Sequence, residues 1–175
     1  MEKTKRLAQM ALMVALMSVC AWISIPFGAQ PFTMQTFAVF VSAALLGAKG
    51  GAAVVLTYIL LGAAGLPVFS AMQGGIGIVL GNTGGYMVGF IFTALIVGFA
   101  AERFSASWAL MLSMIMGTAA CYAFGTAWYM LMYAAHSGGA GLFSVLMTCV
   151  FPFILPDILK MLLALTVIKR IRKHI

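Results

Sequence analysis

The chain has 175 residues, of which 64% are hydrophobic and 7% are charged, and its mean hydropathy is +1.13. A soluble domain has about a quarter of its residues charged, so this composition excludes a soluble globular protein. The net charge of +7 does not indicate nucleic-acid binding, because the basic residues lie at the chain ends and between apolar segments. Long apolar runs without the alternation of barrel strands indicate an all-α integral membrane protein.

Six transmembrane helices are predicted in a single domain that comprises residues 1–175. Their approximate bounds are 7–26, 34–48, 50–66, 84–101, 108–133 and 150–168. The first segment follows basic residues as a signal peptide does. No small-residue cleavage site closes it, so we expect a retained helix.

The basic residues predict the orientation of this bundle. With the N-terminus in the cytoplasm, six crossings place nine of the ten Lys and Arg residues on the cytoplasmic side. Such an excess of Lys and Arg in cytoplasmic segments is the positive-inside rule. We therefore expect both termini in the cytoplasm. Lys160 is the exception, because it lies in the outer half of the last segment.

Two glycine-rich but apolar segments, residues 67–83 and 134–149, connect helices on the outer side. Apolar loops are costly in water, which favours outer loops that cap a pocket, with plain connectors as the alternative. Phe69 in the first of these loops is a candidate pocket residue. Trp128, near the outer end of the fifth segment, is another, although an aromatic belt at the membrane interface also explains it.

Asp157 and Lys160 are three residues apart in the last segment, so they share one helix face. Because charges in hydrocarbon are costly, we expect both to face the bundle interior and to line a ligand site. A self-satisfied ion pair is the alternative. Lys160 supplies a cation for a carboxylate, and Asp157 accepts hydrogen bonds from N–H groups. The pair suits a ligand with both an acid and an amide- or urea-like group.

Polar residues at the outer starts of the second and fourth segments are further candidates for ligand contact. They are Gln35, Thr36, Asn82, Gly84, Gly85 and Tyr86. The Asn82 amide can donate and accept hydrogen bonds, and the two glycines allow a small molecule to approach the backbone. Helix capping and hydrogen bonding between helices are the alternatives.

The sequence does not indicate an enzyme. It has three carboxylates in all, and neither a nucleophile–base set nor a nucleotide-binding motif. Cys20, Cys121 and Cys149 lie in apolar runs without metal-ligand spacing, so we expect no metal and no cofactor. Active transport would then need energy from a partner or an ion.

The first segment carries small residues at helical spacing. Ala8, Ala11 and Ala15 lie on one side, and Ala11-x-x-x-Ala15 allows another helix to approach closely. This pattern favours docking on a partner subunit.

Three segments in their order along the chain resemble the BioY family. They are PFTMQTFAVFVSAALLGAKGGAAVVLTYILLGAAGLPVF (31–69), GNTGGYMVGFI (81–91) and LPDILKMLLAL (155–165). The resemblance covers nearly the whole chain. It implies a six-helix, biotin-binding substrate component (S component) of an energy-coupling-factor (ECF) transporter in the bacterial cell membrane. It also implies a membrane scaffold subunit, which contacts the alanine face, and two cytosolic ATP-binding subunits as partners.

Biotin then becomes the expected ligand. Lys160 suits its valerate carboxylate, Asp157 and Asn82 suit its ureido ring, and the aromatic residues suit its apolar thiophane ring. The alternative is a stand-alone secondary transporter or channel for a small carboxylate-bearing solute, with Asp157 as a proton relay. Against it, the sequence shows neither a second buried ionisable group for the relay nor an inverted repeat. A purely structural membrane protein is a third possibility.

Overall fold

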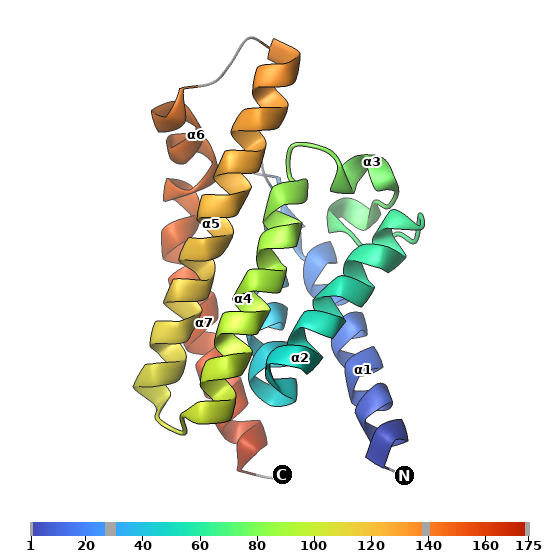
Figure 1. Ribbon diagram of the computed structural model, residues 1–175, viewed down its shortest axis with the longest axis vertical. Coiled ribbons are helices and arrows are strands. Elements are labelled where there is room, and N and C mark those ends of the chain that lie inside the picture. Colours follow the sequence, from blue (N-terminus) through green and yellow to red (C-terminus); the bar gives the residue numbers. More distant parts are fainter. Residues whose placement is uncertain (1, 27–30, 138–140, 174–175) are drawn as a thin grey trace.

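The computed structural model describes residues 2–26, 31–137 and 141–173. The long helices are α1 (Glu2–Trp22), α2 (Gln35–Ala63), α4 (Gly84–Arg103), α5 (Ser107–Ser137) and α7 (Phe151–Arg172). The short ones are η1 (Ser70–Met72), α3 (Ile76–Val79) and α6 (Leu142–Cys149). Strands β1 (Ser24–Ile25) and β2 (Phe32–Thr33) pair antiparallel. The predicted all-α class is confirmed (Figure 1).

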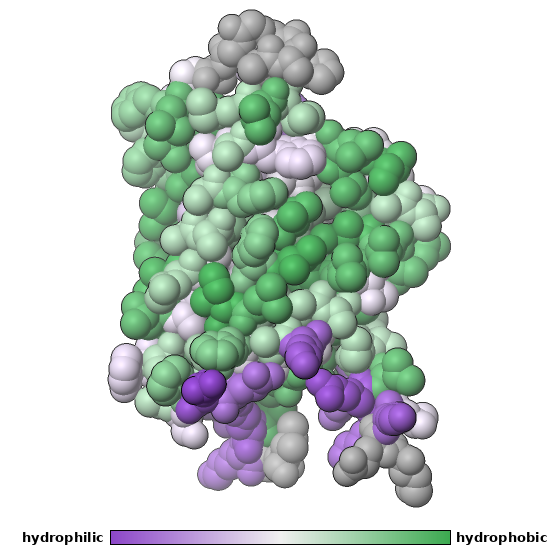
Figure 2. Space-filling view, viewed as in Figure 1, coloured by the Kyte–Doolittle hydropathy of each residue, from purple (hydrophilic) through white to green (hydrophobic). Residues whose placement is uncertain are grey.

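Within the described residues, five helical stretches are long and apolar enough to cross a membrane. They are Lys3–Trp22, Gln35–Ala63, Gly84–Arg103, Ser107–Tyr133 and Leu142–Arg172, the last of which joins α6 and α7. Large hydrophobic side chains such as Leu12, Phe99 and Leu155 lie exposed on the outside of the bundle. Figure 2 shows this hydrophobic surface over most of the face in view. Such a surface is suited to lipid and not to water.

Helix α2 is broken at Gly47, whose backbone lies at φ 76° and ψ −179°. This conformation is essentially restricted to glycine. The side-chain Nε2 of Gln35 donates to the Tyr58 hydroxyl at 2.6 Å, although the two residues are 23 positions apart. In a straight helix they would be about 34 Å apart. The second half of α2 therefore folds back along the first half.

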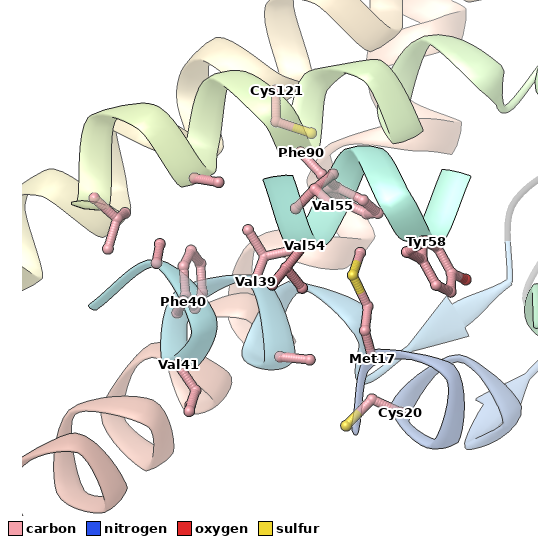
Figure 3. Close-up of a cluster of buried hydrophobic side chains, with 14 of the residues drawn as sticks. Met17, Cys20, Val39, Phe40, Val41, Val54, Val55, Tyr58, Phe90 and Cys121 are labelled. Atoms are coloured by element: carbon pink, nitrogen blue, oxygen red, sulfur yellow. The ribbon is translucent and has the colours of Figure 1, made fainter. Parts of the chain in front are cut away.

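The core lies where both halves of α2 meet α1 and α4. Helix α2 packs most extensively on α4, and α4 packs on α5. Figure 3 shows side chains from these elements pointing toward one another. The most deeply buried large ones include Met17, Val39, Phe40, Val54, Val55 and Tyr58.

The start of α1 and the end of α7 lie at the same end of the bundle, where Figure 2 shows the hydrophilic surface gathered. The helix termini and the break in α2 that meet there carry Lys3, Lys5, Arg6, Lys49, Arg103, Lys169, Arg170, Arg172 and Lys173, and we call this the basic end. The Glu102 carboxylate accepts from the Ala48 N–H at 3.0 Å. The Arg172 guanidinium donates to the carbonyls of Ala44 and Ala101 at 2.7 and 3.2 Å. These bonds tie α7 and α4 to the break in α2.

Among the boundaries that differ from the sequence prediction, three have a local cause. The first helix ends at Trp22 instead of residue 26, because the chain turns there into β1. The predicted break near Lys49 lies at Gly47, which adopts the conformation that the turn requires. Residues 134–149 are not simply a loop, since α5 continues to Ser137 and α6 occupies Leu142–Cys149. The α6 segment contains neither glycine nor proline, the two residues that most disfavour a helix.

Candidate functional site

A cavity of about 240 Å³ lies in the half of the bundle remote from the basic end. It is enclosed by the start of α2, the segment between α2 and α4, α4, α5, α6 and α7. Its wall includes Thr33, Gln35, Thr36, Ser70, Gln73, Ile78, Thr83, Tyr86, Met87, Phe90, Thr93, Thr118, Cys121, Tyr122, Cys149, Phe153, Asp157 and Lys160. Among these, Asp157 and Lys160 are the acidic and basic side chains. Most of these side chains carry a hydroxyl, amide or charged group, and apolar ones such as Met87 and Phe90 lie among them. The wall can therefore hydrogen-bond a polar ligand and also contact its apolar part.

Helix α7 presents two different faces along its length. Asp157, Lys160 and Met161 are buried at the spacing of one helix face. Leu155, Leu159 and Leu162 lie exposed on the opposite side. The sequence therefore directs the two charges inward because the apolar leucines face outward.

The Asp157 carboxylate accepts hydrogen bonds from three helices. Its Oδ1 lies 2.8 Å from the Lys160 ammonium, and both side chains are 5% exposed. The Thr36 hydroxyl of α2 donates to the same oxygen at 3.2 Å. The Tyr122 hydroxyl of α5 donates to Oδ2. A buried charge needs such partners to offset its lost hydration.

The Lys160 ammonium also lies over the ring of Phe32, 4.2 Å from its centroid. Phe32 belongs to β2 and stacks on Phe153 of α7, with ring centroids 6.5 Å apart. A cation over an aromatic face gains electrostatic stabilisation. The ammonium is therefore held between one carboxylate and one ring, at the wall of the cavity.

Gln35 lines the cavity, but its amide is engaged within the protein. Its Oε1 accepts from the Thr33 hydroxyl at 2.9 Å, and its Nε2 donates to the Tyr58 hydroxyl at 2.6 Å. Tyr58 in turn donates to the Val68 carbonyl at 3.0 Å. This chain of bonds joins the two halves of α2 to the segment that follows it.

The glycine-rich start of α4 contributes Tyr86 to the cavity wall, and its hydroxyl lies 3.4 Å from that of Thr126. Gly84 and Gly85 are buried outside the wall. A Cβ on Gly85 would lie 2.2 Å from the Cβ of Trp128. The close approach at Gly85 therefore serves packing of α4 on α5. Asn82 is exposed and lies outside the wall, next to Thr83, which is part of it.

Phe69 and Trp128 also lie outside the cavity wall. Phe69 is fully buried, and its ring meets that of Tyr58 edge-on with centroids 5.5 Å apart. The Trp128 indole donates to the Gly81 carbonyl at 3.0 Å. The Trp22 indole donates to the Pro67 carbonyl at 2.8 Å. These side chains fasten residues 64–83 to the bundle, and Ser70, Gln73 and Ile78 of this segment contact the cavity.

Ala8, Ala11 and Ala15 are exposed on α1. No described helix of the chain covers this side, where Leu7 and Leu12 are also exposed.

Sequence reasoning missed the contributions of α5 to the wall, namely Thr118, Cys121 and Tyr122. Their spacing of three and four residues places them on one helix face. That polar stripe in an apolar helix was the available signal. Which other helix it faces does not follow from local spacing.

A bundle with a lipid-exposed surface that encloses a partly polar cavity defines a membrane protein able to hold a small solute. The BioY family model matches residues 1–175, and the chain belongs to the BioY family. The biotin transporter BioY of Thermotoga maritima is 38% identical over 169 residues, which are 97% of this chain and 96% of that protein. The biotin transporter BioY of Rhizobium etli is 36% identical over 152 residues, 81% of this chain and 78% of that protein.

A solved structure agrees with these sequence relatives. The crystal structure of the S component for biotin from an ECF-type ABC transporter matches with a TM-score of 0.86 and 26% sequence identity. The match covers 98% of this chain and 93% of that one. The BioY family expected from the three sequence segments is therefore found, and the all-α fold is similar to that of an S component.

Proposed function

We propose that the chain captures biotin with high affinity, as the substrate-binding subunit of an ECF-type vitamin importer. The observation that carries the proposal is the buried Asp157–Lys160 pair at the wall of a cavity of about 240 Å³. Relatives that match most of the chain are biotin transporters. The function is binding and transport and not catalysis, and it needs no cofactor.

Biotin's functional groups match the chemistry of the wall. Its carboxylate would meet the Lys160 ammonium, the cationic side chain of this cavity. The ureido group would share the polar side chains of Asp157, Thr36 and Gln35. Apolar side chains such as Phe90 and Met87 suit the thiophane ring.

The remaining candidate residues have smaller proposed roles. Asn82 would contact biotin only at the cavity entrance, because it is exposed beside Thr83. Gly84, Gly85, Phe69 and Trp128 would act through packing that shapes the site.

Six crossings with both termini in the cytoplasm are proposed for the bundle. The break at Gly47 divides α2 into two antiparallel halves, and α6 continues into α7 as one crossing. Gathering of the basic residues at one end favours that end as cytoplasmic. The cavity then opens toward the outer face, and residues 64–83 act as its lid.

The partners that follow are a membrane scaffold subunit and two cytosolic ATP-binding subunits. Exposed small residues at Ala8, Ala11 and Ala15 allow a helix of the scaffold to approach α1 closely. The sequence carries no nucleotide-binding motif of its own. Energy for release would therefore come from those partners, in a bacterial cell membrane.

Uptake of radiolabelled biotin tests this proposal against a stand-alone transporter. Cells that lack other biotin uptake would produce the chain alone or with the scaffold and ATP-binding subunits. We expect fast, ATP-dependent uptake only with the partners, and tight binding by the purified chain without them. Uptake by the chain alone that collapses with the proton gradient would support a secondary transporter instead.

A further inference from the structure

Tyr122 borders two separate hollows of the bundle. On one side it lines the ligand cavity, and on the other it lines an apolar crevice of about 280 Å³ between α5 and α6. The rest of the crevice wall is Ala123, Thr126, Ala127, Met130, Leu142, Leu146 and Val150. The phenol ring therefore lies between the cavity and the crevice, and its hydroxyl donates a hydrogen bond to Asp157.

The hydroxyl of Tyr122 determines how the Asp157 carboxylate can be oriented. Rotation of a carboxylate about its last torsion is broad and roughly two-fold. Oδ1 holds Lys160 and Thr36, whereas the described donor to Oδ2 is Tyr122. A donor on the second oxygen, from a different helix, opposes that rotation. Tyr122 therefore keeps Oδ1 directed toward Lys160.

Lys160 depends on this arrangement because its ammonium is a point charge on a flexible stem of four carbons. Its contacts are Asp157 Oδ1 at 2.8 Å and the ring of Phe32 at 4.2 Å. If the carboxylate turned, the ammonium would lose its closest partner. Its position in the cavity would then be less defined.

We propose that Tyr122 is a positioning residue for recognition of the ligand's carboxylate. It holds Asp157, and Asp157 holds the Lys160 ammonium where the carboxylate of the ligand arrives. This inference rests on the proposed function, and Tyr122 acts through Lys160 without having to touch the carboxylate itself.

A double-mutant cycle with biotin on the purified full chain tests the inference. Tyr122→Phe keeps the ring that separates cavity and crevice but removes the hydroxyl. We expect about tenfold weaker biotin binding, as for a lost hydrogen bond to a charged group. In a Lys160→Ala background the same change should weaken binding less than about threefold, because Lys160 is gone and only the contact of Asp157 with the ureido group is still affected. Tyr133→Phe on the same helix, outside the cavity wall, is the matched control and should leave binding unchanged.

Two outcomes would overturn the inference. Biotin affinity that does not change in Tyr122→Phe would mean that the hydroxyl does not position the site. An equal loss with and without Lys160 would mean that Tyr122 acts on the ligand or on the fold directly. If Tyr122→Phe does not fold, Tyr122→Met removes the same hydroxyl and must show the same dependence on Lys160. If the unmodified chain does not bind biotin, the proposed function itself fails, and that result is distinct from the others.

Discussion

Gly85 illustrates how single residues in the glycine-rich start of α4 act on the site. The ideal Cβ position on Gly85 is 2.2 Å from the Trp128 Cβ and 2.5 Å from its Cγ. Trp128 in turn holds the Gly81 carbonyl. The glycine is required because the indole occupies the space of a side chain, so its effect on the cavity is indirect.

Gly85→Ala is therefore expected to destabilise the protein by about 1–3 kcal/mol, the usual cost of overpacking. The thermal midpoint of the purified chain in detergent measures the effect. Gly77→Ala is the control, since a Cβ there meets nothing within 4 Å. Equal midpoints for the two variants would contradict the packing role of Gly85.

At the residue scale, the sequence was sufficient to place Asp157 and Lys160 on one helix face, because that depends only on local helical spacing. It did not show that Thr36 and Tyr122 share Asp157, since these contacts join helices distant along the chain. Phe69 and Trp128 were predicted near a pocket, and they contact Tyr58 and the Gly81 carbonyl from outside the cavity wall. Whether a side chain faces the cavity or packs behind its wall is determined by how the helices pack together.

At the scale of elements, the break in helix α2 determines where the start of this helix lies relative to the cavity. Its composition predicts two apolar segments, and both are present as halves of one broken helix. The angle between them could not be predicted, because it depends on the backbone of Gly47 and on the Ala48–Glu102 bond. Folding back brings Gln35 to Tyr58 and so places the start of α2 at the cavity.

Gly47→Ala should weaken this fold more than Gly65→Ala. Both glycines have positive φ, +76° and +101°, so each alanine incurs a backbone cost of about 1–3 kcal/mol. A Cβ on Gly47 would also lie 2.0 Å from the Glu102 Oε1 and displace it from Ala48, whereas Gly65 has nothing within 4 Å. Denaturant titration of the two variants compares their free energies of unfolding. A larger loss in Gly65→Ala would contradict the role of the Glu102 contact.

For the whole molecule, the distribution of charge separates the basic end from the cavity. Nine of the ten Lys and Arg residues belong to the basic end, and Lys160 lies at the cavity. This separation was visible in the sequence, because crossings and charges can be counted along a chain. The short α6 was not anticipated, since apolar residues between two crossings do not reveal where a helix restarts.

Cysteine labelling tests the proposed orientation. The native Cys20, Cys121 and Cys149 are buried, but Cys121 and Cys149 line the cavity, so the reaction of the unmodified chain with a membrane-impermeant thiol reagent is measured as the background. Met72→Cys, in the proposed lid, should react in intact cells because residue 72 is 65% exposed. Ser105→Cys, between α4 and α5 near the basic end, should react only after the membrane is opened. The reverse pattern would place the cavity on the cytoplasmic side.

The most direct test of the central claim is the equilibrium affinity of the purified chain for biotin, measured for two lysine variants. Lys160→Ala removes the buried cation of the cavity, whereas Lys49→Ala removes an exposed cation at the basic end. Losing a charge-assisted bond to the carboxylate should weaken binding about 100-fold in Lys160→Ala and leave Lys49→Ala like the unmodified chain. Unchanged affinity in Lys160→Ala, or an equal loss in both variants, would contradict a biotin site built around Lys160.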